Sequence, residues 1–179
     1  MSLYKKWAQK EHSTGTAIVA LLPAGVIFLF LFPYVVVKVG PRLDNLIGLP
    51  SFRIGAVNTI AGGIIMVLGL FFAWWSIYEQ LTRGRGTPLP IIPTQELLMR
   101  GPFRYCRNPM TLGTVVAYVG IGVIVGTIAG IGLMLCFGGI LVLYIKGLEE
   151  KELAERFGEA YLAYKREVPF MIPRRPKRK

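Results

Sequence analysis

Residues 110–145 contain no charged side chain, and this run of 36 residues limits the folds that are open to the chain. At about 1.5 Å per residue, one straight helix of this length would greatly exceed the roughly 30 Å of hydrocarbon in a bilayer. The run instead supplies two crossings of about 27 Å each. It therefore predicts a helical hairpin with its turn near Gly126-Thr127 or near Gly130. The alternative is a partly re-entrant course through the membrane.

Two other uncharged runs precede the hairpin. The first, residues 16–37, is long enough to span a bilayer. It is too long for a signal peptide, and no small-x-small cleavage site follows it. The second runs from Ile54 to Tyr78 and ends in aromatic residues typical of a membrane interface. Residues 38–53, with turn signals at Gly40-Pro41 and Leu49-Pro50, predict a short connection between these two helices.

The composition agrees with this reading. Hydrophobic residues make up 53% of the 179 residues, and the mean hydropathy is +0.51, which excludes an ordinary soluble globule. The fold class that we expect is an all-α integral membrane protein with about four transmembrane helices.

The polar segments complete the predicted architecture. Residues 82–107 are rich in glycine and proline, which favours a turn-rich loop over a continuous helix. After Lys146, apolar side chains recur at spacings of 4, 4 and 3, which predicts one amphipathic helix at the membrane surface. Those side chains are Leu153, Phe157, Tyr161 and Tyr164. The basic tail, residues 174–179, is suited to anionic lipid headgroups.

The basic residues predict the orientation in the membrane. The N-terminal tail carries 3 Lys and Arg, the first connection 3, the second connection 5 and the region from Lys146 onward 10. With four crossings, 18 of the 21 basic residues lie on one side, which the positive-inside rule makes the cytoplasmic side. We therefore expect a multi-pass protein with cytoplasmic N- and C-termini.

Several functional classes are disfavoured. The formal net charge is +11, but the basic residues flank apolar segments and form no separate basic domain, so nucleic acid is not an expected partner. Cys106 and Cys136 form no CxxC motif, and the single histidine, His12, lies in the polar N-terminal tail. Neither a metal site nor a disulfide framework is indicated.

Two polar clusters flank the 36-residue run. Arg104 and Arg107, beside Asn108-Pro109, form a cationic wall that suits a carboxylate or a phosphate, because guanidinium pairs with these groups bidentately. The alternative is that these arginines only reach toward lipid headgroups. Glu149 and Glu150 follow the run directly, where carboxylates are costly unless they are paired or functional; the alternative is a solvated helix end. Facing each other, the clusters would hold a ligand that carries both charges, such as S-adenosylmethionine.

The chain also carries an ordered set of motifs. They are Gly84-x-Gly-Thr-Pro-x-Pro90, Gly101-Pro-Phe-Arg-Tyr-x-Arg-Asn-Pro-Met-x-x-Gly113, Glu149-Glu-x-x-Leu-x-x-x-Phe-Gly-x-x-Tyr-x-x-Tyr164 and Val168-Pro169. This set resembles the membrane methyltransferases of the isoprenylcysteine carboxyl methyltransferase and phospholipid N-methyltransferase superfamily, and it covers about half of the chain. The resemblance divides the chain into an N-terminal region, residues 1–81, and a methyltransferase-like region, residues 82–179.

The resemblance implies S-adenosylmethionine as cofactor, bound on the cytoplasmic side, and a lipophilic methyl acceptor that enters from the bilayer. It assigns the cofactor's amino-acid end to Arg107, Asn108, Pro109 and Gly113. It assigns the rest of the cofactor pocket to Glu149, Glu150 and Tyr161, with Gly63 (or its neighbour Gly62) as a further contact.

The resemblance also suggests catalytic roles. Glu150 is the candidate base or electrostatic partner, and Arg104 or Arg107 would orient an acceptor phosphate or carboxylate. The isoprenylcysteine branch typically has histidine at the position of Asn108 and tyrosine at that of Thr111, so the chain is more similar to the phospholipid branch.

Two other functions stay open at this point. One is an NADPH-dependent enzyme of the sterol-reductase type, although such proteins are usually much longer and have more spans. The other is a non-enzymatic membrane scaffold whose basic edges bind anionic lipid. The acceptor is equally open, since the superfamily methylates nitrogen, oxygen and sulfur atoms.

Overall fold

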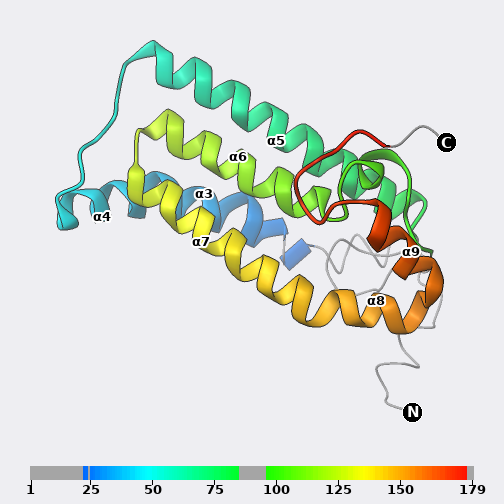
Figure 1. Cartoon of the computed structure of the whole chain (residues 1–179). Helices are drawn as coiled ribbons and strands as arrows, with labels where there is room; N and C mark the ends of the chain where they lie inside the picture. The colour runs from blue at the N-terminus through cyan, green and yellow to red at the C-terminus, as the bar shows by residue number, and fades with distance from the viewer. Residues whose placement is uncertain (1–21, 24, 85–95, 177–179) are drawn as a thin grey trace.

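The computed structural model describes residues 22–23, 25–84 and 96–176 (Figure 1). Within these ranges every regular element is a helix, so the all-α prediction is confirmed there. In chain order the elements are the π-helical turn η1 (Ile27–Leu31), α3 (Phe32–Tyr34), the π-helical turn η2 (Val35–Val39), α4 (Gly40–Ile47), α5 (Ala56–Thr82), the 3₁₀ turn η3 (Gly101–Arg104), α6 (Pro109–Val125), α7 (Ile128–Tyr144), the π-helical turn η4 (Ile145–Glu149), α8 (Glu150–Phe157) and α9 (Glu159–Glu167).

The first helical stretch runs further than the sequence predicted. Residues 16–21 and 24 lie outside the described ranges, but η1, α3, η2 and α4 follow one another without interruption as far as Ile47. The prediction that Lys38 begins a connection is therefore wrong. Pro41 lies in the first turn of α4, just after η2, so this continuous helical stretch includes a residue without a backbone N–H. The helix ends at Gly48, whose φ of 71° suits glycine.

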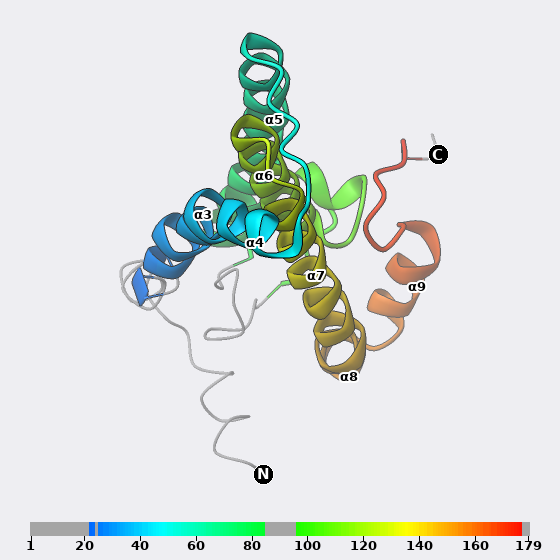
Figure 2. The ribbon, with the colours of Figure 1, turned by 90° about the vertical axis from the view of Figure 1, so that its left-hand side faces the viewer.

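Helices α5 and α6 pack with their backbones in contact (Figures 1 and 2). A Cβ atom on Gly69 would lie 2.4 Å from the backbone nitrogen of Ala117, and one on Gly113 would lie 2.5 Å from that of Ala73. Only glycine permits so close an approach, as small residues do at helix interfaces in membranes. The two helices are antiparallel, so the start of α6 at Pro109 lies beside the C-terminal end of α5.

The uncharged 36-residue run breaks at one of the two predicted positions. Gly126 ends α6 with a φ of 73°, and the Thr127 side chain caps α7 by accepting a hydrogen bond from the Gly130 N–H at 3.0 Å. Among the described residues, two helical stretches are long and apolar enough to cross a membrane, Ala56–Thr82 and Ile128–Phe157. Helix α6, with 17 residues, is shorter. The crossing by four helices stays a prediction.

The outer face of α5 is apolar and exposed. Its large side chains with more than half of their surface exposed include Val57, Ile60, Ile64, Val67, Leu68, Phe71 and Trp74. A contiguous exposed apolar surface of this length is unusual for a soluble monomer and suits contact with lipid.

The C-terminal region returns toward the start of α6. Helix α7 continues through η4 into α8, and Gly158, with a φ of 53°, turns the chain into α9 (Figure 2). The prediction of one amphipathic helix is therefore wrong at Gly158, because its backbone conformation is one that glycine alone adopts easily. Helix α9 still has a buried face, which carries Tyr161 and Tyr164.

Candidate active site

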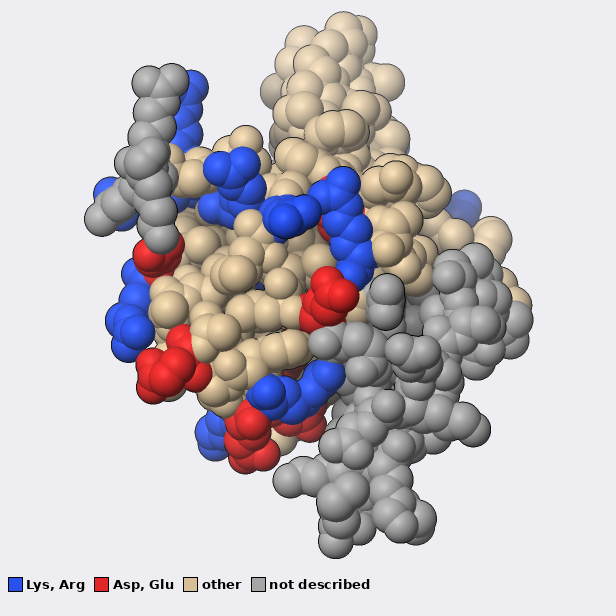
Figure 3. Space-filling view, turned by 90° about the vertical axis from the view of Figure 1, so that its right-hand side faces the viewer, with Lys and Arg blue, Asp and Glu red and all other residues tan. Residues whose placement is uncertain are grey.

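Charged side chains gather at one end of the molecule. Figure 3 shows this end, where α8, α9 and residues 168–176 lie, with basic and acidic groups spread around an uncharged centre. Two segments meet here: the polar loop, which we define as residues 100–108, and the C-terminal strap, residues 168–176. Figure 1 shows the strap (red) crossing the polar loop (green) beside the end of α5.

Backbone hydrogen bonds tie the strap to the loop. The Arg107 N–H donates to the carbonyl of Pro169 at 2.9 Å, and the Arg174 N–H donates to that of Tyr105 at 2.9 Å. Helix α9 adds a third bond, because the buried Tyr164 hydroxyl donates to the Phe103 carbonyl at 2.7 Å. The polar loop is therefore held from several sides and is not a free surface loop.

Asn108 and Phe170 extend this contact. The Asn108 side-chain amide donates to the Phe170 carbonyl at 3.0 Å. The Phe170 ring lies near two cations, with the Lys146 ammonium 4.8 Å and the Arg107 guanidinium carbon 5.5 Å from its centroid. Both distances are in the range of a cation–π contact.

The centre of the site is a buried ion-paired carboxylate. Glu150 is only 6% exposed, and its Oε1 accepts a hydrogen bond from Nη1 of Arg107. Its Oε2 accepts one from the Lys165 ammonium at 2.7 Å. Arg107 Nη1 also donates to the Tyr161 hydroxyl at 3.4 Å. Two cations on one buried acid offset the cost of removing it from water.

Arg107 keeps one donor free. Its Nε is buried and has no hydrogen-bond partner among the residues that the structure describes. An unpaired buried donor costs about 1–3 kcal/mol, so it is the kind of group that a bound ligand satisfies.

Cys106 of the polar loop and Tyr161 of α9 stay protonated at neutral pH. Burial, followed by the negative charge of Glu150, raises the pKa of Tyr161 to about 12, although the hydrogen bond and charge of Arg107 oppose this. Burial raises the pKa of the Cys106 thiol to about 11, against the effect of the Asn108 backbone N–H. Tyr161 therefore acts as a neutral hydroxyl, and Cys106 is a poor nucleophile.

A second polar cluster lies beneath the polar loop, at the end of α5. Glu79 is 6% exposed and pairs with Arg83 at 3.4 Å. A Cβ atom on Gly101 would lie 3.0 Å from the Glu79 carboxyl carbon, so the loop backbone sits directly on this acid. Glu79 Oε2 and Gln80 Oε1 are buried and lack a hydrogen-bond partner within the described ranges.

The structure brings together some of the predicted site residues. Arg107, Glu150 and Tyr161 are in contact, and Asn108 and Pro109 follow Arg107 directly at the start of α6. Neither Glu149, which is half-buried, nor Arg104, which is exposed, makes an ion pair or side-chain hydrogen bond in the described part of the chain.

The two predicted glycines lie elsewhere. Gly113 packs against the backbone of α5 at Ala73, so it serves the contact between the two helices. Gly63 has no atom within 4 Å of an added Cβ, and its neighbour Gly62 packs against Gly120, about 16 Å along α6 from Pro109. The structure thus separates Gly63 from the Arg107 cluster.

Three contributors were missed in the sequence. Lys165 has no distinguishing pattern, since it is one of several charged residues on α9. Phe170 follows the Val168-Pro169 motif and could have been noticed there. Glu79 carried a usable signal, because it is the first charged residue after the uncharged run that ends at Tyr78.

Metal ligands do not gather in the described residues, where no group of three or more His, Cys, Asp or Glu side chains could hold an ion. Cys106 and Cys136 are both free thiols.

Comparison with known proteins agrees with the geometry. The family model described as phospholipid methyltransferase matches residues 57–160, more than half of the chain. The matched region contains all but the first residue of α5, and the polar loop, α6, α7 and α8. No curated protein and no solved structure matches the chain significantly. The chain belongs to the phospholipid methyltransferase family, a membrane-associated family of methyltransferases.

Proposed function

We propose that this protein transfers a methyl group from S-adenosylmethionine to a lipid or another lipophilic acceptor at the cytoplasmic membrane face. The observation that carries the proposal is the cluster of Arg107, Glu150 and Lys165 at the start of α6, in a chain of the phospholipid methyltransferase family. The family match also favours methyl transfer over the reductase alternative.

The residues at the polar loop fit the proposed cofactor. The unpaired Nε of Arg107 suits a carboxylate, which the amino-acid end of S-adenosylmethionine carries. The Glu150 carboxylate and the Tyr161 hydroxyl suit an ammonium group or a ribose hydroxyl. When bound, S-adenosylmethionine supplies an electrophilic methyl group on a sulfonium.

The chain's own residues would mainly exclude water and orient the reactants. Such positioning supplies about 7 kcal/mol or more in favourable cases. Glu150 is buried between two cations and would hold a nearby positive charge or accept a proton from an amine acceptor. Arg104 is exposed on the loop, without an ion-pair partner in the described ranges, and would orient an acceptor phosphate or carboxylate.

The proposed orientation rests on charge. The polar loop and the C-terminal region lie together at the end that the positive-inside rule makes cytoplasmic. Soluble S-adenosylmethionine is available on that side. Membrane lipid is then both the solvent of the helices and the source of the acceptor.

Binding of S-adenosylhomocysteine tests the cofactor assignment. We expect the purified protein to bind it in calorimetry, and Arg107→Lys to weaken binding by about tenfold or more, since lysine lacks the planar fork. Arg42→Lys is the matched control, because Arg42 is exposed on α4 near the opposite end. Undetectable binding in several detergents and in lipid would overturn the proposal.

The acceptor can be found by incubating the protein with labelled S-adenosylmethionine and a total lipid extract. A labelled lipid that is missing with Glu150→Gln would support the assignment. Label that stays wholly in the aqueous phase would contradict a lipophilic acceptor.

A further inference from the structure

The two cations on Glu150 differ in how firmly they are held. The Arg107 side chain is only 11% exposed, and its backbone N–H is bonded to the strap at Pro169. The Lys165 side chain is 44% exposed and reaches Glu150 through a flexible aliphatic stem. An ammonium with this much exposure regains water when it leaves a carboxylate, so Lys165 moves away at low cost. Arg107 is therefore the fixed partner of Glu150, and Lys165 is the mobile one.

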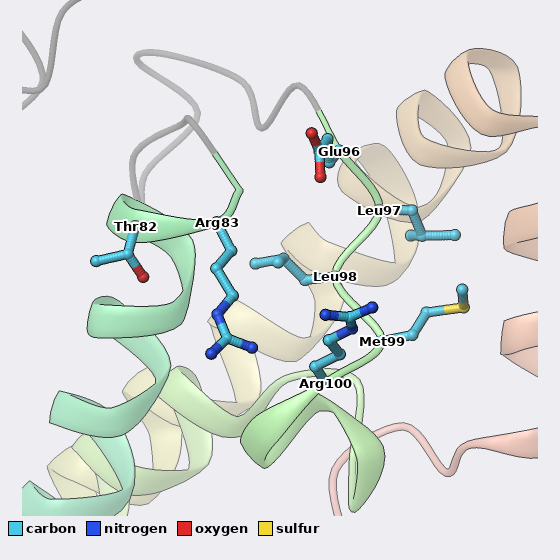
Figure 4. A pocket seen from close by; sticks show the side chains of 7 residues that line it. All are labelled: Thr82, Arg83, Glu96, Leu97, Leu98, Met99 and Arg100. Carbon is cyan, nitrogen blue, oxygen red and sulfur yellow. The ribbon is translucent and has the colours of Figure 1, made fainter.

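Within the described ranges, Glu150 forms ion pairs with these two residues alone. The guanidinium groups of Arg83 and Arg100 belong to a different part of the same end, a pocket of about 420 Å³ at the C-terminal end of α5 (Figure 4). Neither of these arginines is bonded to Glu150. They are therefore not placed to replace Lys165 on the buried carboxylate.

A ligand with both a carboxylate and an ammonium group would use two atoms of this cluster. Arg107 Nε is buried and has no hydrogen-bond partner in the described ranges, so it suits the carboxylate. The ammonium suits a Glu150 oxygen, but both oxygens already accept a bond, Oε1 from Arg107 and Oε2 from Lys165. Two ammonium groups on one oxygen would repel each other, because charges in a buried site are screened weakly. The ligand's ammonium therefore has to displace Lys165 to bind Oε2.

We propose that Lys165 competes with the cofactor's ammonium group for Glu150. Lys165 occupies Oε2 while no ligand is bound, and it moves to solvent when the amino-acid end of S-adenosylmethionine or S-adenosylhomocysteine binds. The exchange keeps two positive charges on the buried carboxylate at each stage, so Glu150 is not left with Arg107 alone. It lowers the affinity for the cofactor and favours release of the demethylated product. The inference rests on the proposed function, since it takes the cofactor's amino-acid end as the ligand.

Two other roles for Lys165 make different predictions. If its ammonium binds the carboxylate of the ligand, removing the charge weakens ligand binding. If it only stabilises the fold, removing the charge lowers the stability equally with and without ligand and leaves the affinity unchanged. Competition alone predicts that the affinity rises.

Calorimetry of S-adenosylhomocysteine binding tests the sign of the effect. The full-length protein in an uncharged detergent is compared with Lys165→Met, which keeps an unbranched side chain and removes the charge. We expect the affinity of the variant to rise about threefold to tenfold, because the competitor is gone. Lys165→Gln should gain less, since its amide still donates an uncharged hydrogen bond.

Lys151→Met is the matched control. Lys151 is exposed on α8 directly after Glu150 and makes no ion pair in the described part of the chain. The control therefore removes the same charge from the same end without removing a bond to Glu150. Its affinity for S-adenosylhomocysteine should stay within about twofold of the wild type.

Two further measurements separate competition from a general change in the site. Methylthioadenosine lacks the amino-acid end, so Lys165→Met should show no comparable gain in affinity for it. Without ligand, Lys165→Met should melt below the wild type in a circular-dichroism scan, because Glu150 keeps only Arg107. With saturating S-adenosylhomocysteine the difference in melting temperature should disappear.

The outcomes distinguish this inference from the proposed function. An unchanged or lower affinity in Lys165→Met and Lys165→Gln, while the wild type binds, would overturn the role of Lys165 and leave the proposed function standing. An equal gain for methylthioadenosine, or a melting difference that saturating ligand leaves in place, would do the same. Absence of S-adenosylhomocysteine binding in every sample, the wild type included, would overturn the proposed function and the role of Lys165 with it.

Discussion

The two ends of the α5–α6 pair are both polar, but they use their polar side chains differently. At the turn end, near Gly126, side chains bond to the backbone. Asn58 accepts the Ile54 N–H at 2.7 Å and donates to the Val123 carbonyl at 2.8 Å. Asp44 accepts the Ala129 N–H at 2.7 Å, in the first turn of α7. These bonds cap helix ends and need no ligand.

The site end, at the polar loop, is less complete. Its buried atoms without a hydrogen-bond partner in the described ranges are Gln80 Oε1, Arg107 Nε and Glu79 Oε2, of which the last has only its 3.4 Å ion pair with Arg83. All three lie within the site end, and none lies at the turn end. Gln80 Oε1 and Arg107 Nε each cost about 1–3 kcal/mol if they stay unpaired. The difference suggests that the polar side chains of the turn end stabilise the fold, whereas those of the site end leave buried polar atoms that a ligand can bond.

The largest effect that would separate the two ends is expected from Arg107→Leu. This change leaves Glu150 buried with Lys165 alone, and breaking such a pair costs about 3–5 kcal/mol. We expect that loss in the free energy of unfolding, measured by dodecyl sulfate titration in mixed micelles, together with loss of S-adenosylhomocysteine binding.

The double variant Arg107→Leu with Glu150→Leu sharpens this prediction. It removes both charges, so most of the stability should return, whereas ligand binding should not. Recovery of both properties would show that the ion pair is structural only, and the contrast between the ends would fail.

Asn58→Leu is the matching change at the turn end. It leaves the Ile54 N–H and the Val123 carbonyl without their partner, so we expect a loss of about 2 kcal/mol in the free energy of unfolding. The affinity for S-adenosylhomocysteine should stay within about twofold of the wild type, because the site lies at the other end of the helices. A larger change in affinity would count against the division of roles.

Features that are set by neighbouring residues could be predicted from the sequence. The break at Gly126 and Thr127 was predictable, because an uncharged run of that length needs a turn and glycine supplies one. The pairing of Arg107 with Glu150 was predictable in outline, since each belongs to a charged cluster close to one end of the same run.

Features that depend on distant contacts were not predictable. The dipeptide Gly40-Pro41 is typical of a turn, yet both residues are helical. A Cβ atom on Gly40 would lie 2.8 Å from the Gly130 Cα, so this helix packs closely against α7. Gly158 lies within the apolar pattern that predicted one amphipathic helix, and nothing in that pattern indicated its positive φ. The strap over the polar loop rests on bonds between residues more than 60 positions apart, such as that from Asn108 to Phe170.

Two buried acids provide a finer comparison. Asp44 accepts a bond at the N-terminal end of α7, where the helix dipole favours a negative charge. Glu79 lies at the C-terminal end of α5, where the dipole disfavours one. We expect Asp44→Asn to lower the free energy of unfolding by about 1 kcal/mol, and Glu79→Gln to change it by less than about 0.5 kcal/mol.

Chemical denaturation of both variants, without ligand, checks this prediction. A loss for Glu79→Gln that equals or exceeds the loss for Asp44→Asn would mean that Glu79 is structural, like Asp44 at the turn end.

The smallest effect is expected from Tyr161→Phe. At neutral pH it removes only one weak hydrogen bond from Arg107, at 3.4 Å, so the free energy of unfolding should fall by less than about 0.5 kcal/mol. At high pH the variant should differ more clearly. The pKa of Tyr161 is raised from its ordinary value of 10 to about 12, so the folded state holds the phenol proton more tightly than the unfolded state does.

The stability that Tyr161 contributes through this pKa shift is complete below pH 10 and is lost as the pH rises from 10 to about 12. Tyr161→Phe should therefore lose less stability than the wild type across that window. It should also lose one late-ionising tyrosine in an absorbance titration at alkaline pH. An identical alkaline profile would mean that the Tyr161 hydroxyl ionises like a solvated phenol, and the site end would then be as open to water as an ordinary surface.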